Sequence, residues 1–146
     1  MLHFRIISVQ NKPPAWVQEG FQEYVKRLSS VCKLDLVEIP VSKPERESEK
    51  ILSLIKSSDF VVALDVKGAS WSTEELAKQF EKWQMHGGTF DFIIGGPEGL
   101  TGDCLKRANA RWSLSALTFP HLIARIVLVE QLYRAWTILK GHPYHK

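Results

Sequence analysis

A chain of 146 residues, 45% of them hydrophobic and 24% charged, has the composition of one ordinary globular domain, which argues against a disordered tail. Its formal net charge of +3 permits an anionic partner without requiring one, so nucleic-acid binding stays open. Cys32 and Cys104 lie far apart and form no CxxC motif, which argues against a disulfide framework or a zinc site and favours the cytoplasm. We expect no leader peptide, membrane span or metal ion.

The first part of the chain predicts two strands and two helices. Leu2–Val9 is rich in β-branched and aromatic residues, which predicts a buried strand. Apolar residues at helical spacing over 14–28 predict a helix, and alternation over Lys33–Ile39 predicts a second strand. The polar stretch Pro40–Glu47 predicts a flexible loop, and the apolar residues that begin at Ile51 mark the next helix.

The same alternation of strands and helices continues to the end of the chain. Phe60–Asp65 and Phe90–Ile94 are continuous apolar runs, as in strands buried on both faces of a sheet. Between them, Ser72 and Glu75 form a capping box that starts a helix. The last predicted elements are a short helix over 101–107, a strand over 111–117 and a long helix over 120–140. The pattern predicts a single α/β domain, residues 1–146, with a largely parallel sheet.

The final helix is apolar around most of its circumference, so it needs two surfaces to bury it. One surface is the sheet. The other is a second copy of the chain, or else the helix is buried entirely within the monomer.

Two motifs stand at the ends of predicted strands, where open α/β sheets bind their ligands. The glycines of IIGGPEGL, residues 93–100, let a ligand approach the backbone, although a plain tight turn is the alternative. This motif lacks the glycine order of a dinucleotide fold and the lysine of a P-loop. The second motif, WSLSALTFPH at 112–121, carries small residues and hydroxyls that suit the wall of an adenine site. Periodicity alone favours a strand core with Thr118 as the helix cap.

The C-terminal tail, residues 141–146, combines two imidazoles, a phenol and an ammonium group. His142 and His145 have no third metal ligand nearby, so a metal site is not expected. A general base or a contact with RNA suits these side chains better.

GGPEGL, WSLSALTFPH, the helical segment EQLYRAW and the tail HPYH together resemble the ribosomal RNA large-subunit pseudouridine N3-methyltransferase family, which belongs to the SPOUT class. The resemblance covers essentially the whole chain, because the family's spacing is also kept at Lys12, Pro14, Trp16, Gly20, Glu23, Tyr24 and Arg27. It implies a SPOUT α/β fold with a C-terminal trefoil knot, a homodimer, and S-adenosylmethionine as the cofactor. The implied reaction is methylation of N3 of a pseudouridine in 23S ribosomal RNA on the assembled ribosome.

The resemblance also assigns candidate site residues. The cofactor contacts that it implies are Leu64, Gly95, Leu114, Ser115, Ala116, Leu117, Thr118 and Phe119. We expect His142 or His145 to accept the proton from N3, because the pKa of an imidazole lies near ~6.5, with Tyr144 and Lys146 positioning the RNA.

Arg125 and Arg134 are further candidates for RNA contacts, since cations that neutralise phosphates supply much of the affinity for RNA. Each also has a structural alternative, and Glu130 stands four residues before Arg134, as in an ordinary helical ion pair. Many family members have arginine where this chain has Lys146, and lysine offers a point charge in place of a planar fork.

Two other functions remain open. One is a SPOUT methyltransferase that acts on transfer RNA or free ribosomal RNA. The other is a non-catalytic ribosome assembly factor with a vestigial cofactor site.

Overall fold

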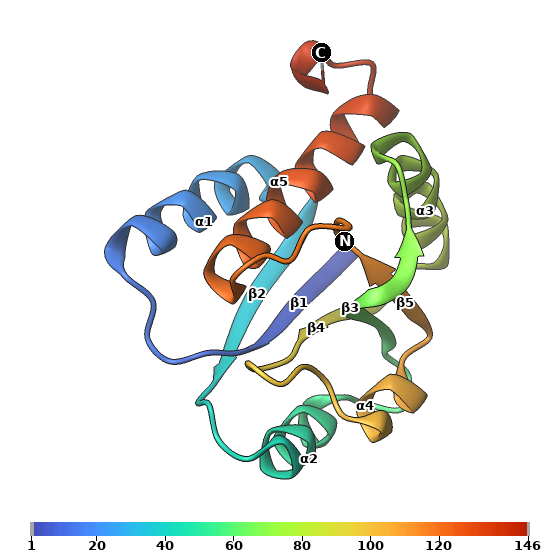
Figure 1. Cartoon of the computed structure of the whole chain (residues 1–146). Helices are drawn as coiled ribbons and strands as arrows, with labels where there is room; N and C mark the ends of the chain where they lie inside the picture. Colours follow the sequence, from blue (N-terminus) through green and yellow to red (C-terminus); the bar gives the residue numbers. More distant parts are fainter. Residues whose placement is uncertain (1, 146) are drawn as a thin grey trace.

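In the computed structural model, which describes residues 2–145, a parallel sheet lies between two layers of helices (Figure 1). The five strands have the order β2-β1-β4-β3-β5. The strands are β1 (Leu2–Val9), β2 (Cys32–Ile39), β3 (Phe60–Ser70), β4 (Thr89–Ile94) and β5 (Ala110–Ser113). The helices are α1 (Ala15–Leu28), α2 (Pro44–Leu54), α3 (Thr73–His86), α4 (Gly102–Arg107) and α5 (His121–Leu139), followed by the short 3-10 helix η1 (Pro143–His145). The predicted α/β fold with a parallel sheet is confirmed.

Each face of the sheet has its own hydrophobic core. Helices α1, α3 and α5 cover one face and α2 and α4 cover the other (Figure 1). On β1, Phe4 and Ile6 belong to the larger core, whereas Ile7 and Val9 belong to the smaller one, because successive side chains point to opposite faces of a sheet. Burial on both faces accounts for the continuous apolar runs of the central strands.

The helix starts follow local chemistry, and one of them corrects a predicted loop. The predicted capping box is present, because the Ser72 hydroxyl accepts a hydrogen bond from the amide of Glu75 at 3.1 Å. The predicted loop Pro40–Glu47 is wrong in its second half, since α2 already begins at Pro44. Proline suits the first turn of a helix, and the buried Glu47 side chain accepts a bond from the amide of Ser42 at 2.8 Å.

The strand predicted over 111–117 ends early, at Ser113. The Ser113 hydroxyl donates to the carbonyl of Ser115 at 3.0 Å, and the Ser115 hydroxyl accepts from the amide of Leu117 at 3.0 Å. These local side-chain bonds compete with a strand ladder. Residues 114–119 are therefore free to leave the sheet.

Strand β3 is longer than predicted and contains a β-bulge. Trp112 pairs with Leu64 and again with Ala69, so residues 65–68 lie outside the regular ladder. A Cβ atom on Gly68 would lie 2.6 Å from the carbonyl carbon of Arg111. This is too close for any side chain, so only glycine fits. The bulge therefore depends on Gly68.

The apolar helix α5 packs against α1, α3 and the sheet (Figure 1). Leu128, Val129, Leu132 and Ala135 are buried, whereas many of its other apolar side chains are only partly covered. Within residues 2–145, no helix has the length and apolarity needed to cross a membrane.

A buried carboxyl group lies in the middle of β4. Asp91 is fully buried, with Arg5 Nη1 3.5 Å from its Oδ1 and 3.6 Å from Oδ2 of Asp59. Burial, followed by the neighbouring Asp59 carboxyl, raises the pKa of Asp91 to about 7. In the unfolded chain, the Asp91 carboxyl loses its proton at the ordinary aspartate pKa of ~4. The native state keeps this proton up to about pH 7, so the free energy of unfolding falls as the pH rises from ~4 to about 7.

We predict that Asp91→Asn removes this loss, because the amide cannot ionise. Between pH 4.5 and pH 7.5 the unfolding free energy of the variant should rise relative to that of the wild type by at least about 1 kcal/mol, as measured by urea unfolding. Asp103→Asn, at an exposed site, is the control and should show no such rise. Parallel pH curves for wild type and Asp91→Asn would contradict the prediction.

Candidate functional site

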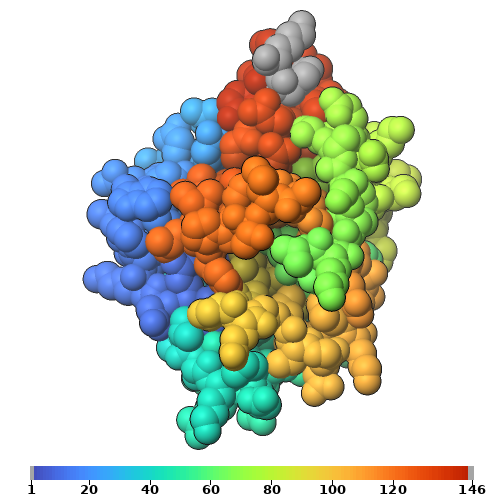
Figure 2. All heavy atoms as spheres, in the orientation of Figure 1, coloured from blue at the N-terminus to red at the C-terminus, as the bar shows by residue number. Residues whose placement is uncertain are grey.

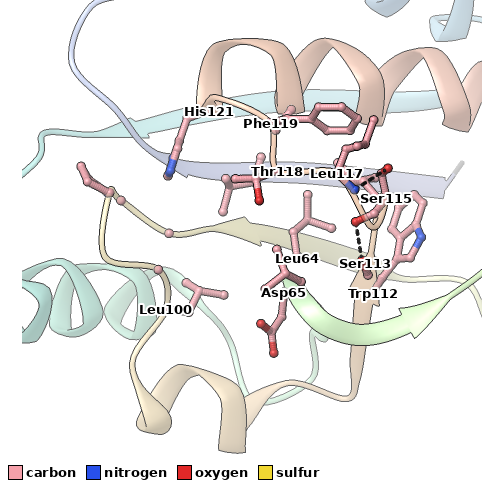
Figure 3. Close-up of a pocket in the computed structure, with 18 of the residues that line it drawn as sticks. Leu64, Asp65, Leu100, Trp112, Ser113, Ser115, Leu117, Thr118, Phe119 and His121 are labelled. Carbon is pink, nitrogen blue, oxygen red and sulfur yellow. Dashed lines mark hydrogen bonds between the residues drawn. The ribbon is translucent and has the colours of Figure 1, made fainter.

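A cavity of about 220 Å³ opens at the carboxyl ends of β4 and β5 and beside the bulge of β3 (Figure 3). Parallel strands direct these ends to one edge of the sheet, which is where such sheets bind ligands. The walls come from residues 64–66, residues 94–100, and residues 112–119 with the start of α5. These segments lie on one face of the molecule, in green, yellow and orange (Figure 2). All of the predicted cofactor contacts line the cavity except Ala116.

The glycine-rich loop forms one wall of the cavity through its backbone. The Gly96 carbonyl accepts a hydrogen bond from the amide of Gly99 at 2.9 Å, which closes a tight turn. A Cβ atom on Gly95 would lie 2.5 Å from the carbonyl carbon of Gly99 and 2.7 Å from the amide nitrogen of Leu100. The motif is therefore both a tight turn and a cavity wall, and it allows a ligand to reach backbone groups.

Residues 112–119 form the opposite wall. Trp112 is buried and stacks on Trp71 with ring centroids 5.4 Å apart, which anchors this segment to the larger core. Leu117 lines the cavity with 70% of its surface exposed. The alternative role of Thr118 as the helix cap is wrong, because Pro120 occupies the N-cap position of α5 with no side-chain cap bond.

Among the described residues that line the cavity, the charged or titratable side chains are Asp65 and His121. The Asp65 carboxylate accepts a hydrogen bond from the amide of Lys67 at 3.3 Å. Burial is the main cause that lowers the pKa of His121. The Glu47 carboxylate opposes this effect more weakly, and the Arg125 guanidinium adds to the lowering. Nδ1 of His121 is buried without a hydrogen-bond partner, which also disfavours the imidazolium. The cavity thus contains one carboxylate and an imidazole that favours its neutral form.

Arg125 is buried and cannot make the predicted contact with RNA in this structure. Only 1% of the residue's surface is exposed. Its guanidinium donates hydrogen bonds to Gln10 at 2.7 Å, Ser8 at 3.2 Å and Glu38 at 3.3 Å. The prediction is corrected accordingly: Arg125 fastens α5 to the ends of β1 and β2, which is its structural alternative.

Arg134 and Tyr144 hold the C-terminal tail against α5. The predicted ion pair is present, with Arg134 Nη2 2.8 Å from Glu130 Oε2. The Tyr144 hydroxyl donates to Glu130 Oε2 at 3.1 Å, and its ring packs against Tyr133 at 4.7 Å between centroids. Burial first, and then the hydrogen bond with Tyr24, raise the pKa of Tyr144 well above its usual value. The phenol therefore stays protonated and acts as an anchor.

The tail lies beyond the C-terminal end of α5 (Figure 1), whereas residues at the start of α5 line the cavity. His121 begins the helix beside the cavity, and exposed His142 follows its other end. A helix of 19 residues spans about 28 Å at 1.5 Å per residue. One chain therefore does not bring the predicted proton acceptors to the predicted cofactor contacts. The side chain of His145 and all of Lys146 lie outside the described residues.

In the part of the chain that the structure describes, no group of three or more His, Cys, Asp or Glu side chains could hold a metal ion.

Comparison with known proteins gives full-length matches. The chain matches the family model described as "Predicted SPOUT methyltransferase" over residues 2–145. It is 47% identical over 155 aligned positions to the ribosomal RNA large subunit methyltransferase H of Hahella chejuensis, covering 99% of each chain. The proteins of the same name from Pseudomonas aeruginosa and Marinomonas sp. are 44% and 45% identical, over 99% of this chain and 100% of theirs.

We predict that Gly95→Ala lowers the unfolding free energy by about 1–3 kcal/mol, because its Cβ must displace the backbone at Gly99 and Leu100. Urea unfolding measures this effect. Gly102→Ala is the matched control, since a Cβ there meets nothing within 4 Å, and its unfolding free energy should stay within about 0.5 kcal/mol of the wild type. Equal effects of the two substitutions would show that the close approach at Gly95 does not matter.

Proposed function

We propose, because this chain belongs to the SPOUT methyltransferase family, that it transfers a methyl group from S-adenosylmethionine to N3 of a pseudouridine in 23S ribosomal RNA. The observation that carries the proposal is the cavity in which residues 64–66 of β3 meet the segments that follow β4 and β5. The relatives named as large-subunit ribosomal RNA methyltransferases support the choice of RNA. We place the reaction on the assembled ribosome, in the cytoplasm.

The residues around the cavity suit this cofactor. Leu64, Leu114 and Leu117 offer apolar contacts for an adenine ring, and Gly95 allows close approach to backbone groups. We assign the cofactor contacts to these residues and to the neighbouring residues 115–119. The sulfonium of S-adenosylmethionine supplies a methyl group that is already activated. The protein's main task is then to hold donor and acceptor in line, which can lower the activation barrier by roughly 7 to 11 kcal/mol.

We propose that the segment after β5 carries the trefoil knot of the family. From β5 at the edge of the sheet, the chain returns to the middle of one face, where α5 packs between α1 and α3 (Figure 1).

We propose that a homodimer brings the tail of one protomer close to the cavity of the other. Leu122, Ile123 and Val127 of α5 are partly buried apolar side chains that belong to neither hydrophobic core, so they offer a surface to a second copy. In a twofold dimer with antiparallel α5 helices, the tail of one protomer lies beside the cavity of its partner. We therefore propose that His142 or His145 accepts the N3 proton across the dimer interface.

We assign the contacts with RNA to the same end of the dimer site. Tyr144 would position the tail through its bond to Glu130, while Arg134 and Lys146 would contact the RNA. Arg134 is suited to this because its side chain remains 30% exposed while paired with Glu130.

Subunit mixing tests whether the tail acts across the interface. Gly95→Ala and the double variant His142→Ala/His145→Ala should each lose most methyl transfer. A heterodimer with one protomer of each kind, isolated through two different tags, should recover about half of the wild-type rate, since one cavity then faces one intact tail. A heterodimer as inactive as both parents would contradict action across the interface.

The substrate is tested by methyl transfer from labelled S-adenosylmethionine to ribosomes that lack the modification. Separated subunits, naked ribosomal RNA and transfer RNA run in parallel, with mass analysis of the nucleosides. We predict labelled N3-methylpseudouridine in large-subunit RNA, formed fastest on intact ribosomes. Label in transfer RNA or only in naked RNA would instead support the other methyltransferase function, and failure to bind S-adenosylmethionine would support an assembly factor with a vestigial cofactor site.

A further inference from the structure

We propose that Asp65 makes the cavity favour a cationic methyl donor over the neutral product that remains after transfer. The inference rests on the proposed function, because it takes the donor to be S-adenosylmethionine.

The β-bulge places Asp65 at the cavity. Trp112 pairs with both Leu64 and Ala69, so the residues between them leave the ladder where β3 reaches the cavity. Gly68 allows this by its close approach to the backbone of Arg111. The amide of Lys67 then holds one carboxylate oxygen of Asp65, and Figure 3 shows this side chain next to Leu64 among the lining residues.

The charges around the cavity are negative on balance. No lysine or arginine is among the described residues that line it, and His121 favours its neutral form. Behind the glycine loop, the carboxylate of Glu47 packs against Gly96 and adds a second negative charge. Arg125 lies near His121, but its guanidinium is paired with Glu38. Among the described residues that line the cavity, no positive side chain therefore offsets the attraction of Asp65 for a cation.

The reaction changes the charge of the cofactor by one unit. The acceptor N3 gives its proton to the base, and its electron pair forms the new bond to the methyl carbon. The carbon–sulfur bond breaks, and both of its electrons stay on sulfur, which becomes a neutral thioether. Attraction between Asp65 and the sulfonium thus exists before transfer and disappears after it. Because Coulomb attraction acts over several ångströms, the carboxylate favours donor binding and product release without direct contact.

Binding calorimetry on Asp65→Asn tests the inference with three probes: S-adenosylmethionine, the neutral product S-adenosylhomocysteine, and sinefungin, in which an amine replaces the sulfonium. Asparagine keeps the oxygen that accepts the Lys67 amide, so the bulge should persist. We expect the dissociation constants of the two cationic probes to rise about tenfold and that of the neutral product to change less than about twofold. Asp103→Asn, the same substitution at an exposed position of α4, should change none of the three.

Equal weakening of all three probes would overturn the inference, because Asp65 would then bind the adenosine part that they share. Unchanged binding of all three would overturn it as well. Neither result touches the proposed function, which fails separately if the wild-type protein binds none of the probes.

Discussion

At two places near the carboxyl edge of the sheet, the backbone passes so close to another stretch of backbone that only glycine fits. Gly95 lies against the backbone of Gly99 and Leu100, which curls the glycine-rich loop into a cavity wall. Gly68 lies against the backbone of Arg111, which pushes the preceding residues of β3 out of the ladder. The shape of the cavity and the position of its carboxylate both depend on these two contacts, because a side chain at either glycine would have to displace backbone.

Helix α5 connects the cavity to the rest of the molecule. Near its start, Arg125 fixes it to Ser8 and Gln10 at the end of β1 and to Glu38 on β2. Beyond its other end, the bond from Tyr144 to Glu130 holds the tail. The 19 residues of α5 span about 28 Å, and because the helix is fixed at both ends, it keeps cavity and tail apart by about its own length within one chain. We propose that a second copy, packed on the partly covered apolar surface of α5, joins them.

Most of the fold could be predicted from local patterns. The apolar runs of β3 and β4 and the capping box at Ser72 depend on neighbours in sequence, and each was found where predicted. The cavity residues could be located because they stand at the ends of predicted strands. Burial of Arg125 could not be predicted, because its acceptors lie more than eighty residues away in sequence. Asp65 had no assigned role, and its only signal was Gly68, a glycine that interrupts a strand.

The proposed function requires that the cavity between β3, β4 and β5 binds the methyl donor. Nuclear magnetic resonance of the ¹⁵N-labelled protein tests it most directly, by following every backbone amide during a titration with S-adenosylmethionine. We predict saturable shifts that are largest at Leu64, Gly95 and residues 114–119. Saturable shifts confined to other parts of the protein, such as the helices α2 and α4, would place the donor elsewhere and contradict the account.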